Sequence, residues 1–124
     1  MMVDTPEVLL KEYEQRLSAQ KFEDVKPLIH KDAVFWFNDG SYLGIDSIEA
    51  AFNKTFELIK EEKYWLTNVE WIYQSEDAAS CHYQFNWEGI IEGVASAGGG
   101  RGTSVLRKTD GSWQIVHEHL SRNP

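Results

Sequence analysis

The chain has 124 residues, the size of one domain, and we expect residues 1–124 to form a single domain. Hydrophobic residues make up 42% of the chain and charged residues 26%, a balance that excludes the disordered and fibrous classes of protein. The formal net charge of −8 makes nucleic acid an unfavourable partner, because its backbone phosphates would be repelled.

Cysteine usage and hydropathy predict a cytoplasmic protein. The one cysteine, Cys81, excludes an intramolecular disulfide and fits a reducing compartment. The first residues, MMVDTPE, lack the apolar stretch of a secretory signal, and no run approaches the roughly 18–20 apolar residues of a membrane span. We therefore expect no membrane partner.

Two helices are predicted at the start of the chain. Apolar residues recur at helical spacing from Pro6 to Ser18, and Thr5 and Pro6 are typical of a helix start. A second, shorter helix follows, with Asp24 as its cap and Pro27 in its first turn, where a missing N–H costs little.

A strand and a third helix come next. The run AVFWF at 33–37 is typical of a strand, and Asn38-Asp39-Gly40-Ser41 is typical of a turn. Asp46 and Glu49 resemble a capping box and predict the start of a helix that ends in the charged stretch 60–63.

The rest of the chain is predicted to form an antiparallel sheet. Turn signals separate the expected strands, which are 64–74, 78–91, 102–108 and 112–121. Asp110-Gly111 is the strongest hairpin signal in the chain, and the glycines before Arg101 are typical of a loop or a bulge at a bend. Helices followed by a long antiparallel sheet predict the α+β fold class.

Strand alternation assigns side chains to the two faces of the sheet. One face of the last strand is expected to hold alternate residues, namely Trp113, Ile115, His117 and His119. A two-residue turn would set Leu106 opposite Ile115 and Ser104 opposite His117.

The strand 78–88 carries an apolar set that includes Tyr83. If the helices cover this set and the histidine face together, the enclosed space holds aromatic rings and two imidazoles, a mixture typical of small-molecule pockets.

The pair His117 and His119 leaves three interpretations open. The two side chains are packed histidines bonded to neighbouring groups, or they bind a ligand or exchange protons near neutral pH. The third interpretation is a metal site, but a third ligand is lacking, because alternation places His82 on the opposite face. We expect neither a metal nor a cofactor.

Other chemistry-bearing residues also have two interpretations. Arg101 beside its glycines suits a carboxylate or phosphate, although no nucleotide-binding motif is present. Asp39 is more typical of a turn residue than of a base. Tyr13 and Glu118 are further candidates that more often have structural roles, and Cys81 is expected to pack in the core.

The order of elements, with GRGTSVLRKTDGSWQIVHEHLS at 100–121, resembles the SnoaL-like branch of the nuclear transport factor 2-like superfamily. The stretches 76–79, 110–113 and 116–119 are also similar to the association (hub) domain of calcium/calmodulin-dependent protein kinase II. The resemblance implies a cone in which a curved antiparallel sheet wraps around about three N-terminal helices, with a deep pocket at its open end. It also implies a homodimer formed through the sheets.

Only some site residues of the related families have counterparts in this sequence. The aspartate base of ketosteroid isomerases aligns with Phe37, and Asp39 lies two residues further on. The pocket arginine of the hub domain aligns with Ser104, whereas His117 and His119 stand at the positions of that family's terminal histidines.

These observations predict a ligand-binding set composed of Phe37, Asp39, Tyr83, Arg101, His117 and His119. The expected function is the binding of a small polar or anionic molecule in an aromatic-lined pocket. The alternatives are a self-association module like the kinase hub domain and an acid–base enzyme of the isomerase, dehydratase or cyclase type.

Overall fold

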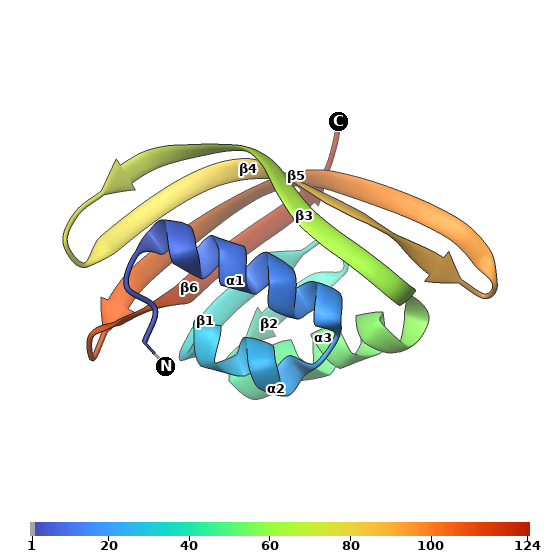
Figure 1. The fold of residues 1–124 in the computed structure, drawn as a ribbon, viewed down its shortest axis with the longest axis horizontal. Helices are drawn as coiled ribbons and strands as arrows, with labels where there is room; N and C mark the ends of the chain where they lie inside the picture. The colour runs from blue at the N-terminus through green and yellow to red at the C-terminus, as the bar shows by residue number, and fades with distance from the viewer. Residues whose placement is uncertain (1) are drawn as a thin grey trace.

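The computed structural model describes residues 2–124 and places the helices on one face of a curved six-stranded sheet (Figure 1). The helical elements are α1 (Pro6–Ala19), α2 (Phe22–Val25), the 3-10 turn η1 (Lys26–Leu28) and α3 (Ile45–Leu58). The strands are β1 (Ile29–Phe37), β2 (Gly40–Leu43), β3 (Lys60–Gln74), β4 (Ala78–Ile91), β5 (Val94–Thr109) and β6 (Ser112–Arg122).

The first helix forms as its sequence predicts. The side chain of Thr5 accepts a hydrogen bond from the Val8 backbone N–H, and Pro6 occupies the first helical position, which needs no N–H. The helix ends at Gln20, whose backbone is left-handed (φ 58°) and whose N–H bonds to the Leu17 carbonyl.

Three predicted helix boundaries are wrong. Asp24 lies inside α2, which is preceded by Lys21, and Asp46 lies in the first turn of α3 and does not cap it. The residue before α3 is Gly44, which adopts a φ of 85° that other residues avoid. The charged stretch that begins at Lys60 extends β3, because the backbone becomes extended at Ile59.

The strand order is β2-β1-β6-β5-β4-β3, and all neighbours are antiparallel except β1 and β6, which are parallel. The core lies between the inner face of the sheet and α1, α2 and α3. The α+β fold class and the curved sheet around the helices are therefore confirmed. Within residues 2–124, no helix is long and apolar enough to cross a membrane.

The predicted hairpin between β5 and β6 is confirmed. Asp110 and Gly111 both have positive φ values, 51° and 81°, as a two-residue hairpin turn requires. The turn sets Leu106 opposite Ile115, in the expected register.

A β-bulge at Val116 then reverses the alternation of the last strand. Leu106 pairs with Ile115 and Val105 pairs with His117, so Val116 has no opposite residue. The predicted pairing of Ser104 with His117 is wrong, because Ser104 pairs with Glu118. As a result, Glu118 is buried on the inner face and both C-terminal histidines lie on the outer face.

The glycine run lies inside β5 and forms neither a loop nor a bulge. Each of three glycines of β5 lies opposite an aromatic residue of β4; the pairs are Tyr83–Gly102, Phe85–Gly100 and Trp87–Gly98. A Cβ on any of these glycines would collide with the opposite ring. The glycines therefore let three rings lie flat on the inner face, where they form one wall of the space under the sheet.

Side chains of α1 bond to the backbone of β3, the last strand of the sheet. The Ser18 hydroxyl accepts from the Tyr64 N–H at 2.9 Å, and the Glu14 carboxylate accepts from the Leu66 N–H at 2.8 Å. The Gln20 amide donates to the Ile59 carbonyl, just before the strand, at 2.7 Å. These bonds fix the distance between the helix and the sheet.

Candidate functional site

The inner pocket is a cavity of ≈ 170 Å³ between the helices and the sheet. Most of its lining is aromatic, and its lining residues are Tyr13, Leu17, Phe37, Phe52, Thr55, Phe56, Ile59, Glu62, Tyr64, Phe85, Trp87, Glu118 and Leu120. A cavity of about 150 Å³ lined by apolar groups holds one benzene molecule. The inner pocket therefore has room for a compound of about one ring.

Glu118 is the polar group at the floor of the inner pocket. Its side chain is fully buried, and the Tyr13 hydroxyl donates to Glu118 Oε2 at 3.1 Å. The Tyr83 hydroxyl lies 3.5 Å from Glu118 Oε1 and 2.7 Å from the Ser104 hydroxyl. A carboxyl held by two phenols thus faces a space that is mainly apolar.

Burial raises the pKa of Glu118 from its ordinary value of 4.5 to about 8, although the hydrogen bonds from Tyr13 and Tyr83 favour the charged form. Burial and the nearby Glu118 also raise the pKa of both tyrosines well above 10. At neutral pH, the floor of the pocket is therefore mostly a neutral carboxylic acid between two neutral phenols.

Glu62 marks the mouth of the inner pocket. Thr55, Phe56, Glu62 and Trp87 are half-buried, whereas the floor residues are buried. Burial raises the pKa of Glu62, and a hydrogen bond from the Gln20 amide at 3.3 Å opposes the shift. Both ionisable carboxyl groups of the lining are glutamates, and the lining contains no lysine, arginine or histidine.

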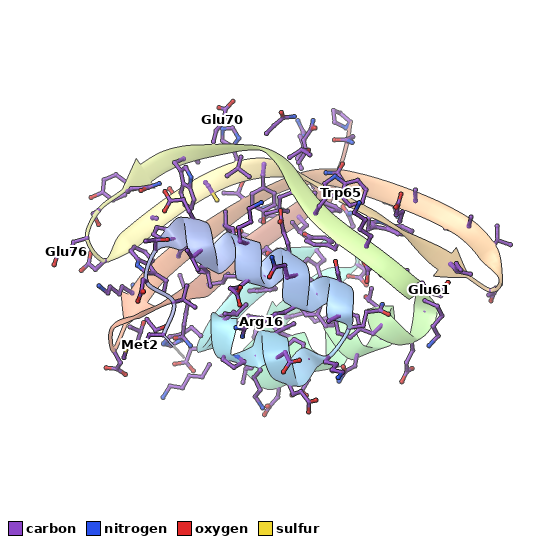
Figure 2. The ribbon with its side chains drawn as sticks, viewed as in Figure 1. Met2, Arg16, Glu61, Trp65, Glu70 and Glu76 are labelled. Carbon is purple, nitrogen blue, oxygen red and sulfur yellow. The ribbon has the colours of Figure 1, made fainter. Side chains whose placement is uncertain are left out.

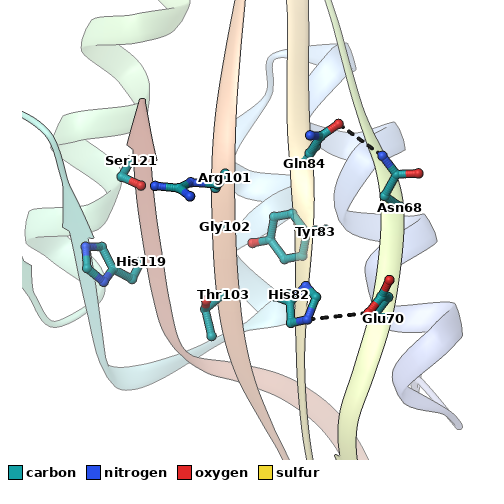
Figure 3. A pocket seen from close by; sticks show the side chains of 10 residues that line it. All are labelled: Asn68, Glu70, His82, Tyr83, Gln84, Arg101, Gly102, Thr103, His119 and Ser121. Carbon is teal, nitrogen blue, oxygen red and sulfur yellow. Dashed lines mark hydrogen bonds and ion pairs between the residues drawn. The ribbon is translucent and has the colours of Figure 1, made fainter. Parts of the chain in front are cut away.

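A second hollow, the outer groove, lies on the opposite face of the sheet and has a volume of ≈ 570 Å³ (Figure 3). One row of paired residues crosses five strands in the order Glu70, His82, Thr103, His119 and Trp36. Glu70 Oε2 lies 3.6 Å from His82 Nε2 in an exposed setting, a contact worth little in solvent.

Arg101 lies in the next row of the outer groove. Its guanidinium extends towards Ser121, as Figure 3 shows. Asn68 and Gln84 of the same groove bond to each other at 3.0 Å. Most residues that line the outer groove have polar side chains, whereas most residues that line the inner pocket are aromatic or aliphatic.

His117 and His119 flank Trp36 on the outer face. Their rings meet the indole edge-on, with centroid distances of 4.8 and 5.5 Å, and Trp36 keeps 45% of its surface exposed. His117 Nδ1 lies 2.7 Å from the Val34 carbonyl oxygen. The two imidazoles are therefore part of an aromatic cluster at the surface.

The structure divides the predicted ligand-binding set between the two faces. Phe37 lines the inner pocket, and Tyr83 lies beneath it next to Glu118. The other members lie elsewhere; they are Asp39, Arg101, His117 and His119. The hypothesis that the imidazoles form the polar end of the aromatic pocket is wrong, because the bulge turns them to the outer face.

Asp39 takes part in the turn after β1. Its carboxylate accepts a hydrogen bond from the Tyr42 hydroxyl at 2.9 Å in an exposed setting. Phe37, at the position of the isomerase base, brings only an apolar ring to the inner pocket. The only carboxyl group at the floor of the pocket within residues 2–124 comes from Glu118.

Glu62 and Tyr64 line the pocket but are absent from the predicted ligand-binding set. Glu62 lies in the stretch 60–63, which is predicted as a helix end, and Tyr64 begins the predicted strand 64–74, whose two faces the sequence analysis does not assign. Their signal is the alternation of Glu62, Tyr64 and Leu66, which is typical of a strand with one covered face.

The outer-face histidines do not assemble a metal site. His82 shares their face, contrary to the prediction, but Thr103 separates it from His119 across the strands. Among residues 2–124, no three His, Cys, Asp or Glu side chains form a group that could hold a metal ion.

Many solved structures have the same fold, and the proteins they represent carry different names. A nuclear transport factor 2-like superfamily protein from Salmonella enterica serovar Typhimurium has a TM-score of 0.85 and 18% identity over 94% of this chain and 87% of that chain. A protein from Xanthomonas campestris is named after the calcium/calmodulin-dependent protein kinase II association domain. It has a TM-score of 0.85 and 21% identity, and the match covers 95% of this chain and 85% of that chain.

A ketosteroid isomerase-like protein from Erwinia carotovora atroseptica has a TM-score of 0.79 and 20% identity, and the match covers 93% of this chain and 91% of that chain. At such identities these likenesses show the fold alone. No curated protein matches the chain. The family model of the SnoaL-like domain matches residues 7–124, and the chain therefore belongs to the SnoaL-like family.

Proposed function

We propose that the protein binds a small, mainly apolar molecule of about one ring in the inner pocket, oriented by Glu118. The observation that carries the proposal is the buried carboxyl of Glu118, which borders an aromatic cavity of ≈ 170 Å³. Buried carboxyls destabilise a fold unless they are fully satisfied, so their presence at a cavity wall favours a functional role.

The lining also argues against the anionic ligand class expected from the sequence. Glu118 and Glu62 are the ionisable carboxyls of the pocket, and no cation lies among the lining residues. A carboxylate ligand would lose its hydration without gaining a positive partner. A neutral or cationic molecule fits the pocket better.

Binding of a one-ring probe is expected to stabilise the protein. Benzyl alcohol at about 100 times its dissociation constant should add about 2.7 kcal/mol and raise the melting temperature, whereas a steroid should not, because the cavity is too small. The measurement is a thermal-shift titration.

A pair of variants locates the binding site. Thr55→Trp fills the mouth of the pocket and should abolish the shift, while Thr103→Trp puts the same ring on the outer face and should preserve it. A shift that survives Thr55→Trp would contradict the assignment of the pocket.

The Glu118 carboxyl also suits acid–base catalysis. A group whose pKa is about 8 can both donate and accept a proton near neutral pH, as general acid–base catalysis requires. If the protein turns over its ligand, Glu118 is the residue that we expect to exchange the proton.

The outer face favours a second candidate function, self-association. Trp36, Val105 and Tyr73 are exposed on this face, with 45%, 37% and 59% of their surface accessible. Glu70 points away from the helices on the same face, as Figure 2 shows, and lies two strands from Arg101. A two-fold axis that passes between these two residues would bring each Arg101 next to Glu70 of the other copy, which is the self-complementary arrangement of a symmetric dimer.

A homodimer through the outer face is expected to dissociate when a charge is placed in it. Val105→Asp should weaken dimerisation at least tenfold, measured by size exclusion with light scattering, because the added carboxylate would lose its hydration in the interface. Leu58→Asp, at the exposed end of α3, is the matched control and should leave the dimer intact. A wild-type protein that stays monomeric at about 100 micromolar would refute self-association as its function.

A further inference from the structure

We propose that the ligand of the inner pocket is a small organic cation, an ammonium group attached to an apolar body of about one ring. The inference rests on the proposed binding function of the pocket and specifies the chemical class of its ligand.

The first argument is the combination of rings and carboxyls around the cavity. Tyr64 and Phe85 stack with their planes 19° apart, and Phe52 of α3 also lines the cavity. The faces of aromatic rings attract ammonium groups, and carboxylates provide the charged partner. Glu118 at the floor and Glu62 at the mouth supply that partner at both ends of the pocket.

The second argument is charge selection. The lining contains two glutamates and no basic side chain, and the whole chain carries a formal net charge of −8. The summed field therefore attracts cations and repels anions as they approach. An ammonium group in the pocket would relieve the cost of a buried carboxylate, which a neutral ligand cannot do.

The third argument concerns the proton on Glu118. The groups that face its carboxyl are Tyr13 from α1, Tyr64 from β3, and Tyr83 and Cys81 from β4. Burial raises the pKa of each tyrosine well above 10 and that of Cys81 to about 12, so none of these groups titrates between pH 6 and pH 8. A bound ammonium group favours the ionised carboxyl, and cation binding must therefore release the Glu118 proton.

A matched pair of probes, benzylamine and benzyl alcohol, tests the inference. Benzylamine is a cation between pH 6 and pH 8, and its affinity should rise roughly 50-fold over this range, because the ionised fraction of Glu118 rises by that factor. Benzyl alcohol has the same ring without the charge, and its affinity should change less than about threefold. Isothermal titration in two buffers of different ionisation enthalpy should also show the released proton for benzylamine.

Variants assign the effect to its residue. Glu118→Gln keeps the shape and polarity of the side chain and should lose benzylamine binding while it retains benzyl alcohol. Glu57→Gln removes an exposed glutamate of α3 and should change neither affinity. Thr55→Trp should abolish the binding of both probes.

The possible failures are distinguishable. Suppose that benzyl alcohol binds in the pocket. If benzylamine then binds no more tightly at pH 8 than at pH 6, or binds Glu118→Gln as well as it binds the wild type, the cation inference is overturned and the proposed binding function stands. If neither probe binds, both are overturned.

Discussion

Replacing Gly100 by alanine is expected to destabilise the fold by about 3 kcal/mol or more. A Cβ at this position would collide with the backbone carbonyl oxygen of Ser121 and would lie 2.8 Å from the Phe85 ring. Neither neighbour can retreat easily, because Ser121 belongs to the paired backbone of β6 and the Phe85 ring is part of the pocket wall. Urea unfolding followed by circular dichroism measures the loss.

Gly40→Ala provides the matched control for this substitution. Gly40 has no positive φ, and an added Cβ would lie 3.5 Å from Tyr42, which is ordinary van der Waals contact. Its effect should stay within about 0.5 kcal/mol. An unchanged urea midpoint for Gly100→Ala would mean that the contact between glycine and ring is not a constraint on the sheet.

Glu118 is expected to make the protein less stable as the pH rises from 4.5 to 8. In this window the folded protein keeps the Glu118 proton, because burial raises the pKa to about 8, whereas the unfolded chain releases it near 4.5. The unfolded state therefore binds fewer protons, and the free energy of unfolding falls with pH by roughly 4–5 kcal/mol before it levels off above pH 8.

Glu118→Gln should remove this slope, since an amide does not titrate. The variant should match the wild type near pH 4.5 and exceed it in stability at pH 8.5. Urea unfolding at several pH values measures the difference, and Glu57→Gln, on the exposed face of α3, should follow the wild type. Parallel stability curves for the wild type and Glu118→Gln would show that the carboxyl is not held in its neutral form.

The sequence predicted those elements that depend on residues close together in the chain. The helix from Pro6 depends on its cap and its apolar stripe, and the hairpin depends on Asp110-Gly111, so both are confirmed with their register near the turn. The α+β class follows from the order of these elements. The family resemblance supplied the curvature of the sheet, which no periodicity shows.

The placement of the site could not be predicted because it depends on pairing between strands. No glycine or proline near Val116 signals the bulge in the sequence. The assignment of alternate residues to opposite faces assumes that the strand pairs without interruption. One extra residue therefore exchanged the positions of Glu118 and the histidines. The role of the glycines in β5 was missed for the same reason, since it depends on the rings of β4 opposite them.

The bonds from α1 to β3 have a consequence for how the protein resists aggregation. A free strand edge is a template for adding another chain, but Ser18 and Glu14 already occupy backbone groups of β3 at Tyr64 and Leu66. Shifts of register interrupt the remainder of this edge, between Thr67 and Glu70 and again before Tyr73, and the opposite edge strand, β2, has only 4 residues. The sheet is thereby protected against growth by strand addition at both of its edges.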